Sequence, residues 1–417
     1  MGGIRQVMLT QAKLATLIEK ILPHAESAGL VLPHVHFELV DAQDINALAS
    51  YHGLPVRYAH WSFGKSFGRL KTAYDYRTSK IYELVINTKP FYAFIDRSST
   101  DAQSALIVAH VLAHVDYFCH SRLFADVNSD VLNQMARHSH QISHMLRIYG
   151  QNAVESLLDA AMVLEDHVGR ITKGKKPGQD PSDILGFIAL NSPILADWER
   201  QILLMVRDES RYFWPQRLSK ISNEGYATFW HTRLIRELSL GASMGWEMAI
   251  LNSKLLTITP PQLNPYALGQ RIYESLFHQY GMNHVMAARN LLDDAGLIRE
   301  GLTEDVIRQC HLDVFREQES AFSSLRTEPG QIKRQLLQDV DDGGVPHLRI
   351  HPKSREQSTL VIEHQYDGRD LDFYELPNAL KIISQRLWGG LVQVYTMKQG
   401  VTHIASHNGS KWADEVV

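Results

Sequence analysis

The stretch 99–124, STDAQSALIVAHVLAHVDYFCHSRLF, decides the fold class. Apolar residues recur along it at helical spacing, no Gly or Pro interrupts it, and residues 99–101 supply capping chemistry at its start. It predicts a long helix that packs among other helices. His110 and His114 stand four residues apart on this helix, so both imidazoles project from one face and can meet a single ion.

A second helical stretch, NEGYATFWH at 223–231, carries a glutamate two helical turns before a histidine. Because offsets of three, four and seven residues return to one side of a helix, Glu224 and His231 share a face. A glutamate is rarely buried without a partner. We predict that Glu224 and His231 meet His110 and His114.

Two histidines from one helix and a glutamate from a later helix form the ligand set of a catalytic zinc site. We therefore expect His110, His114 and Glu224 to bind a divalent metal, with zinc as the first candidate. The logic is that of gluzincin peptidases, but those enzymes carry the general-base Glu directly after the first His, where this chain has Val111. The catalytic candidates that remain are His231, Glu165 and Asp116. His231 is also a candidate fourth ligand or transition-state hydrogen-bond donor.

A simpler interpretation needs no metal. A pair of histidines four residues apart is common on amphipathic helices, and a carboxylate in the first turn of a helix is favoured by the helix dipole. On this interpretation Glu224 caps its helix and His231 is a core histidine that is hydrogen-bonded to it. His138, His140 and His144 lie in ARHSHQISHMLR and are predicted to form a solvated helix face.

The aromatic stretch HWSFGKSFGRLKTAY at 60–74 is punctuated by two glycines. Its polar residues are His60, Lys65, Arg69 and Tyr74. Because Gly permits close backbone approach, the stretch is a candidate loop for binding an anion or carboxylate, with His60 and Lys65 as substrate-binding residues. The alternative is a loop packed by its aromatic side chains, with Lys65 in solvent.

Composition excludes several classes of protein. The 417 residues carry a net charge of −4, and no Lys/Arg-rich tract offers a footprint for nucleic acid. No apolar run approaches the roughly 20 residues of a membrane span, and the N-terminus lacks the apolar stretch of a signal peptide. We expect a cytoplasmic protein. The two cysteines, Cys119 and Cys310, fit a reducing compartment and exclude a thiolate-only metal cluster.

Hydrophobic periodicity predicts an α+β protein with a mainly α-helical core and a small C-terminal α+β domain. The predicted divisions are 1–50, a helix and strand segment; 51–325, the helical core with the His/Glu constellation; and 326–417, the C-terminal domain. The predicted helices are 9–29, most of 99–170, 184–213 ending at Pro215, 223–240, 265–297 and a helix that ends at Gly389. The predicted strands include 81–88 and 91–95, and Asp367-Gly368 is a hairpin signal.

Seven blocks, in order and spacing, resemble the SpoVR family of stage V sporulation protein R. They are HWSFGKSF, KIYELVINT, AHVLAHVDYF, DILGFIALNSPILADWERQIL, FWPQR, NEGYATFWHTRL and NPYALG. The resemblance spans residues 50–275 most strongly. The family's motif residues fall on His60, Lys65, His110, His114, Asn223, Glu224, His231, Asn264 and Tyr266. The chain departs from the family at Ala113, Tyr226 and 119–121.

The resemblance implies a cytoplasmic protein linked, in spore formers, to the peptidoglycan of the spore cortex. It also implies association with a serine protein kinase and a von Willebrand-type-A-domain protein. Two functions follow. One is a metal-dependent hydrolase of an amide or peptide bond in a cell-wall precursor or fragment, with Asn264 and Tyr266 closing one wall of a substrate pocket. The other is a non-enzymatic assembly or adaptor protein whose His/Glu cluster is a structural polar network.

Overall fold

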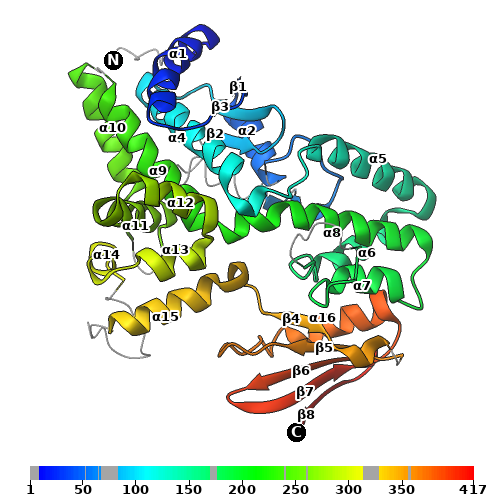
Figure 1. Cartoon of the computed structure of the whole chain (residues 1–417). Helices are drawn as coiled ribbons and strands as arrows, with labels where there is room; N and C mark the ends of the chain where they lie inside the picture. Colours follow the sequence, from blue (N-terminus) through cyan, green and yellow to red (C-terminus); the bar gives the residue numbers. More distant parts are fainter. Residues whose placement is uncertain are drawn as a thin grey trace, which may run out of the picture. The chain divides into compact units, whose positions relative to one another are not determined.

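The structure is a computed structural model of the chain. It describes residues 9–51, 53–63, 65–66, 83–169, 176–238, 241–259, 262–312, 328–355 and 358–417. Helices dominate and the strands form two small sheets, so the predicted α+β class with a helical core is confirmed (Figure 1). The chain divides into two compact units: residues 1–132 with 218–340, and residues 133–217 with 341–417. Each unit combines two separate segments, and the division of the chain at 50 and 325 stays a prediction.

The first unit consists of a three-stranded sheet and a set of helices around one apolar core. Its elements are α1 Gln11–Ser27, β1 Val35–Val40, α2 Ala42–Ser50, β2 Glu83–Ile86, β3 Phe91–Asp96, α4 Asp101–His120, η1 Arg122–Phe124, α9 Lys220–Glu237, α10 Ala242–Leu255, α11 Pro265–Tyr280, α12 Met282–Leu291, α13 Asp294–Gly301, α14 Glu304–Gln309 and α15 Pro329–Val340. The strand order is β1–β3–β2, with β1 parallel and β2 antiparallel to β3.

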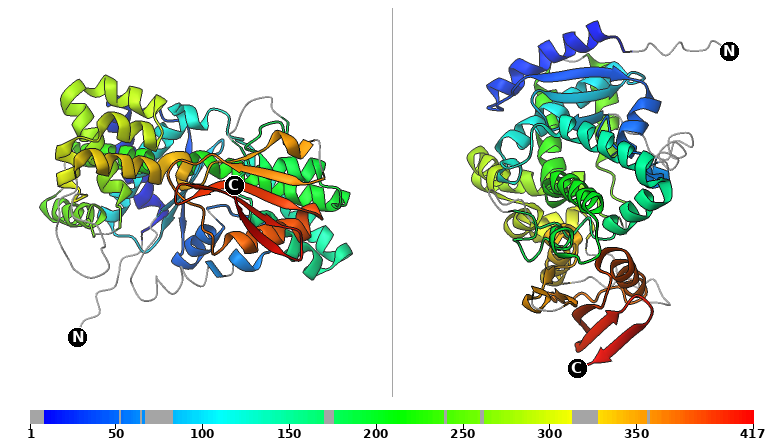
Figure 2. Two further views of the ribbon diagram at one scale, coloured as in Figure 1. Left: turned by 90° about the horizontal axis from the view of Figure 1, so that it is seen from below. Right: turned by 90° about the vertical axis from the view of Figure 1, so that its right-hand side faces the viewer.

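Helix α4 lies at the centre of this unit and contacts α1, α9, α10 and the sheet (Figures 1 and 2). It starts with the predicted capping chemistry, since Thr100 and Gln103 form a reciprocal capping box. By length and composition α4 is apolar enough to cross a membrane, which corrects the prediction that no segment is. However, 78% of its apolar window is buried within the fold, which is typical of the core helix of a soluble protein.

Helices α9 and α11 approach each other closely through two glycines. A Cβ on Gly269 would lie 2.2 Å from the Ile221 carbonyl oxygen and 2.6 Å from the Cα of Gly225. A Cβ on Gly225 would meet the backbone of Gly269 at 2.4 Å. Only glycine fits at these two positions, and the close approach brings α11 beside the helix that carries Glu224.

The second unit packs helices with a five-stranded sheet. Its elements are most of α5 Val131–Tyr149, α6 Gln151–Met162, α7 Ile184–Asn191, α8 Asp197–Leu218, η2 Asp341–Gly344, β4 Leu348–Ile350, η3 Pro352–Arg355, β5 Leu360–His364, α16 Leu376–Ile382, η4 Ile383–Trp388, β6 Val392–Lys398, β7 Val401–His407 and β8 Trp412–Val416. The strands follow the order β4–β8, coloured orange to red in Figures 1 and 2. Strands β5 and β6 are parallel, and α16 and η4 form the crossover between them.

Several predicted boundaries are wrong. The stretch 184–213 is two helices, since residues 192–196 separate α7 from α8, and Pro215 does not stop α8, which runs on to Leu218. The stretch 265–297 is not one helix: Gly281, with a φ of +82°, separates α11 from α12. Asp367-Gly368 does not close a hairpin, because β5 leads into the crossover helix. The predicted stop at Gly389 is confirmed by its left-handed conformation.

Candidate metal site

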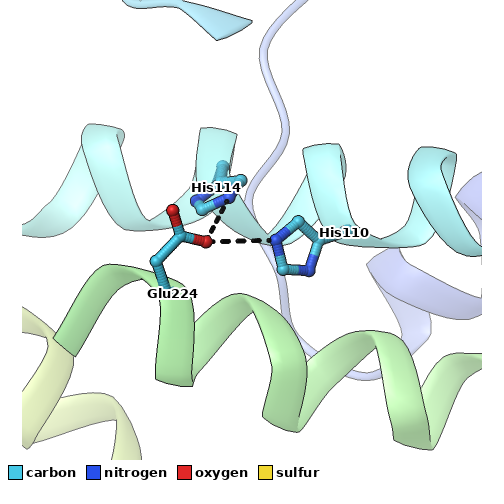
Figure 3. Close-up of side chains that lie close together, drawn as sticks. All are labelled: His110, His114 and Glu224. Atoms are coloured by element: carbon cyan, nitrogen blue, oxygen red, sulfur yellow. Dashed lines mark hydrogen bonds and ion pairs between the residues drawn. The ribbon is translucent and has the colours of Figure 1, made fainter. Parts of the chain in front are cut away.

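Three of the predicted ligands lie together between α4 and α9. The side chains of His110 and His114 leave α4 one turn apart and face Glu224 on α9 (Figure 3). The Nε2 atoms of His110 and His114 lie 3.4 Å and 3.5 Å from Oε2 of Glu224. The three candidate ligand atoms all lie within 4.8 Å of one another. The predicted juxtaposition is therefore present, and the histidines are buried.

Helix α9 begins at Lys220, so Glu224 lies in its second turn and cannot cap it. The capping carboxylate is Asp294, whose two oxygens accept the backbone N–H groups of Ile221 and Ser222 at 2.9 Å and 2.7 Å. The alternative in which Glu224 caps its own helix is wrong. Its carboxylate is left to face the histidines.

A hydrogen-bond chain behind His110 orients its ring. Nε2 of His231 donates to the Asn252 side-chain oxygen at 2.9 Å, and the two Nδ1 atoms of His231 and His110 lie 2.8 Å apart. If His231 carries its proton on Nε2, its Nδ1 accepts the Nδ1–H of His110. Nε2 of His110 then presents a lone pair toward Glu224. His231 lies behind His110 and does not form the predicted hydrogen bond to Glu224.

His114 has a partner of the same kind. Its Nδ1 donates to the side-chain oxygen of Asn223 at 2.8 Å, which leaves Nε2 toward Glu224. Histidines that bind metals characteristically donate their other ring N–H to an oxygen or a further polar partner in this way. Asn223 belongs to the same block as Glu224, whereas Asn252 lies on α10 in a stretch with no sequence signal.

Burial and mutual contact shift the pKa values of all three side chains. Burial and the neighbouring His114 lower the pKa of His110, so this ring stays neutral. For His114 burial lowers the pKa, but hydrogen bonding and charge attraction from Glu224 outweigh it and raise the pKa. Burial also opposes ionisation of Glu224, yet the two facing histidines outweigh it and hold the pKa of this carboxyl far below its usual value. A proton on His114 can therefore occupy the place that a metal ion would take.

Two further side chains complete the surroundings of the site. Tyr266 stacks 6.0 Å from the His110 ring, and burial followed by the charge of Glu224 raises the pKa of its hydroxyl. Glu83 on β2 was missed by the sequence analysis. Burial and the Glu224 charge raise its pKa to about 7. Glu83, Tyr266 and His110 line one cavity of about 90 Å³. The only signal for Glu83 was a lone acidic residue inside the apolar block KIYELVINT.

Two predicted catalytic residues have other surroundings. Asp116 is fully buried and ion-paired with Arg289; it also accepts the Tyr226 hydroxyl at 2.6 Å and the backbone N–H of Val31 at 2.9 Å. These bonds favour a structural role for Asp116. Glu165 is exposed and belongs to the second unit, so the geometry of the site adds nothing in its favour.

Two of the predicted substrate-binding residues, Asn264 and Tyr266, lie at the start of α11. Asn264 caps α11 by accepting the Ala267 N–H at 3.1 Å, and its amide donates to the carbonyls of Leu255 and Thr257 at 2.8 Å and 2.9 Å. It therefore positions Tyr266 two residues further on.

His60 and Lys65 do not line the cavity beside His110. His60 is buried beside Ser62, and Lys65 is exposed. Arg69 and Tyr74 lie outside the described residues. A substrate-binding role for His60 and Lys65 stays a prediction.

The predicted solvated histidine face is partly wrong. His140 and His144 are exposed, but His138 is buried and its Nδ1 lies 3.1 Å from the Glu209 carboxylate. The carboxylate belongs to α8, which packs against this side of α5 within the second unit.

A second His/carboxylate group occurs in the second unit. Asp341, His347 and Asp367 offer atoms within 4.8 Å of one another. Both nitrogens of His347 already face carboxylates, at 2.9 Å from Asp341 and 3.5 Å from Asp342. Asp367 is ion-paired with Arg369. The group is partly exposed, and each member already has a polar or charged partner.

The fold and the site define a mainly helical α+β protein with a candidate metal centre built on two core helices. A sequence model of one family, described as SpoVR like protein, matches residues 9–179 and 171–345. The chain belongs to the SpoVR family, as its seven sequence blocks predicted. No solved structure is significantly similar to it.

A relative in Escherichia coli (strain K12), uncharacterized protein YcgB, is 26% identical over 302 residues. The alignment covers 58% of this chain and 59% of the relative's length.

Proposed function

We propose that the chain is a metal-dependent hydrolase of an amide or peptide bond. His110, His114 and Glu224 would hold one divalent ion, with zinc as the first candidate. One observation carries the proposal: two buried imidazole Nε2 atoms converge on one carboxylate oxygen, at 3.4 Å and 3.5 Å, while polar partners hold both Nδ1 atoms from behind. An oxygen partner behind the ring, such as the one His114 has in Asn223, is characteristic of metal-binding histidines.

The three candidate ligands are of the kinds that hold a catalytic zinc ion in hydrolases. Three ligands of the His₂Glu type are those of catalytic zinc sites, which keep a further position for water or substrate. A bound divalent ion would polarise a carbonyl and lower the pKa of a coordinated water toward neutrality. Among the residues of this chain, Tyr266 stands beside the His110 ring with a neutral hydroxyl. It is suited to donate a hydrogen bond to an oxygen on which negative charge develops.

The experiment is elemental analysis of the purified full chain after growth with added zinc, manganese and iron. We expect about one divalent ion per chain in the wild type and no stoichiometric metal in His114→Ala. His144→Ala is the matched control, because this histidine is exposed on a helix of the second unit. A metal-free wild type that also fails to take up zinc in equilibrium dialysis would contradict the proposal.

The cell-wall substrate and the partners rest on the family resemblance alone. We propose a peptide-like bond of a peptidoglycan precursor or fragment as the target. A serine protein kinase and a von Willebrand-type-A-domain protein are the proposed partners. Tagged full-length chain that co-purifies neither kind of protein from its own host would count against the partners, and it would leave the metal site unaffected.

One observation favours the adaptor function instead. The histidines of the group are buried, and the cavity that His110 lines with Tyr266 measures about 90 Å³. A buried polar network of this kind can serve to fix the packing of α4 against α9. The metal analysis separates the two functions, because a purely structural network keeps its proton on His114 and takes up no ion.

A further inference from the structure

The carboxylate of Glu83 belongs to a residue that lines the cavity beside the candidate metal site. Glu83 opens strand β2 and pairs through its backbone with Ile95 of β3. Its side chain is partly buried, and within the described part of the chain no hydrogen bond or ion pair reaches it. A partly buried carboxylate that lines a cavity and has no other partner among the described residues is a candidate for function.

The position of Glu83 relates it to the His/Glu group. It lines the cavity of about 90 Å³ together with His110 and Tyr266. The charges of Glu224 and His114 both act on it. Yet Glu83 stands outside the set of ligand atoms that lie within 4.8 Å of one another. Glu83 therefore lines the cavity next to the candidate ligands and is not one of them.

We propose that Glu83 is the general base of the site, acting on an amide substrate whose small aliphatic group occupies this cavity. The inference rests on the proposed function. It fills the role left open by Val111, which stands where gluzincin peptidases carry their base. The base comes from a strand, so no motif around the histidines could reveal it.

The step balances with water as the only co-reactant. Glu83 takes one proton from water as the water oxygen forms a bond to the carbonyl carbon of the amide. The Tyr266 hydroxyl hydrogen-bonds to the carbonyl oxygen as it gains negative charge. The C–N bond then breaks, and the proton held by Glu83 passes to the leaving nitrogen. The products are a carboxylic acid and an amine, and Glu83 returns to its starting state.

The cavity defines the class of group that the substrate presents. Beyond Glu83, Gln103, His110 and Tyr266, its lining is aliphatic: Leu106, Ile107, Leu251 and Leu255. The small volume of about 90 Å³ and this lining favour a small aliphatic side chain over an aromatic or charged one.

The first test needs no substrate. Cobalt(II) is loaded into wild type, Glu83→Gln and Glu38→Gln, and the visible absorption of the bound ion is followed against pH. We expect equal cobalt content in all three. The midpoint of the spectral change should move by at least about one pH unit in Glu83→Gln, because a base bonded to the water is lost. Glu38, an exposed residue of β1 in the same sheet, is the matched control and should leave the midpoint unchanged.

The same experiment can overturn the proposal in two ways. An unchanged midpoint in Glu83→Gln shows that the carboxylate does not act on the water. Loss of cobalt from this variant shows that Glu83 is a ligand instead. In both outcomes the wild type still binds metal, so the proposed function survives. A wild type that binds no metal contradicts both the proposed function and the role of Glu83 as general base.

The second test uses a panel of acetylated dipeptide amides with Ala, Val, Phe, Asp or Lys beside the scissile bond, followed by mass spectrometry. We expect the zinc-loaded wild type to cleave the Ala and Val members at least about tenfold faster than the others. Glu83→Gln should lower that rate by about a hundredfold or more at unchanged zinc content. Equal rates in the variant overturn the base. Cleavage of none of the panel, or preference for Phe, Asp or Lys, overturns the substrate class.

Discussion

The described part of the chain contains two His/carboxylate groups that are similar in residue type but differ in the hydrogen-bond partners of their histidines. In the first unit, the Nδ1 atoms of His110 and His114 are held by a His231 nitrogen and by Asn223, and both Nε2 atoms are directed at Glu224. In the second unit, both nitrogens of His347 already face aspartates. Residue type and proximity are alike in the two groups. What differs is which ring nitrogen is left for an ion, and this depends on the partners behind each ring.

The sharpest test of this contrast removes one histidine from each group. His110→Ala should lower zinc affinity by more than the roughly hundredfold that outer partners contribute, because a ligand itself is lost. His347→Ala should leave the zinc content of the chain unchanged. Isothermal titration with zinc measures both. Two equivalents bound by wild type, with one lost in His347→Ala, would make the groups equivalent and break the contrast.

Each unit contains a buried ion pair, so the contribution of such a pair to stability can be compared between the two units. Arg289 pairs with the buried Asp116 in the first unit, and Arg207 with the buried Asp183 in the second. Replacing either arginine by methionine leaves a buried carboxylate without its ion-pair partner. This should lower the free energy of unfolding by about 3–5 kcal/mol. Urea unfolding measures the loss. Arg308→Met is the control, since its exposed contact with Asp305, at 3.7 Å, should be worth about 0–1 kcal/mol.

The partner behind His231 should matter at an intermediate level. Asn252→Ala removes the oxygen that orients His231, and through it His110, so zinc affinity should fall by about 10–100-fold. Asn252→Asp should retain the affinity, because a carboxylate accepts the same N–H. Equal affinity in Asn252→Ala and wild type would show that the hydrogen-bond chain does not orient the ligand.

The affinity of the site for metal should fall as the pH is lowered. Glu224 raises the pKa of His114, so below that pKa the metal-free site holds a proton that an incoming ion must displace. The apparent zinc affinity should therefore fall by about tenfold for each pH unit below this pKa, and become pH-independent above it as far as His114 is concerned. Zinc titrations between about pH 5 and pH 8 measure the slope, and an affinity that rises on acidification would contradict the assignment.

The smallest effect belongs to the second unit. Asp341→Asn removes one partner of His347 at a partly exposed position. Such pairs contribute about 0–1 kcal/mol, so urea unfolding should shift little and zinc content should not change. A loss of several kcal/mol would show that the second group is as strongly organised as the first.

Local sequence patterns predicted the parts of the site that depend on one helix. The capping residues and unbroken apolar run fix α4, and the four-residue spacing then places His110 and His114 on one face. Glu224 was paired with them through helical spacing and the family blocks, and Tyr266 was assigned to the site through its block. These features depend on near neighbours, so they can be recognised without the fold.

Glu83 and Asn252 could not be found in this way. A glutamate in a short strand and an asparagine in a helix carry no motif, and each gains its surroundings only when separate segments pack around α4. The same limit explains His138, which looks solvated in sequence but meets Glu209 of α8. It also explains the two units, because each joins segments that are far apart in the chain.

The sequence by itself determined the helical core, the membership of the SpoVR family and the pair of histidines on one face, because helical periodicity and capping are local properties. Only the tertiary structure decided which nitrogen of each histidine is turned inward and that Asp294, rather than Glu224, caps α9. It alone brought Glu83 to the cavity that His110 lines. Hydrogen-bond partners and burial arise from packing between distant segments, and these are the properties that distinguish a candidate site from a group of similar residues.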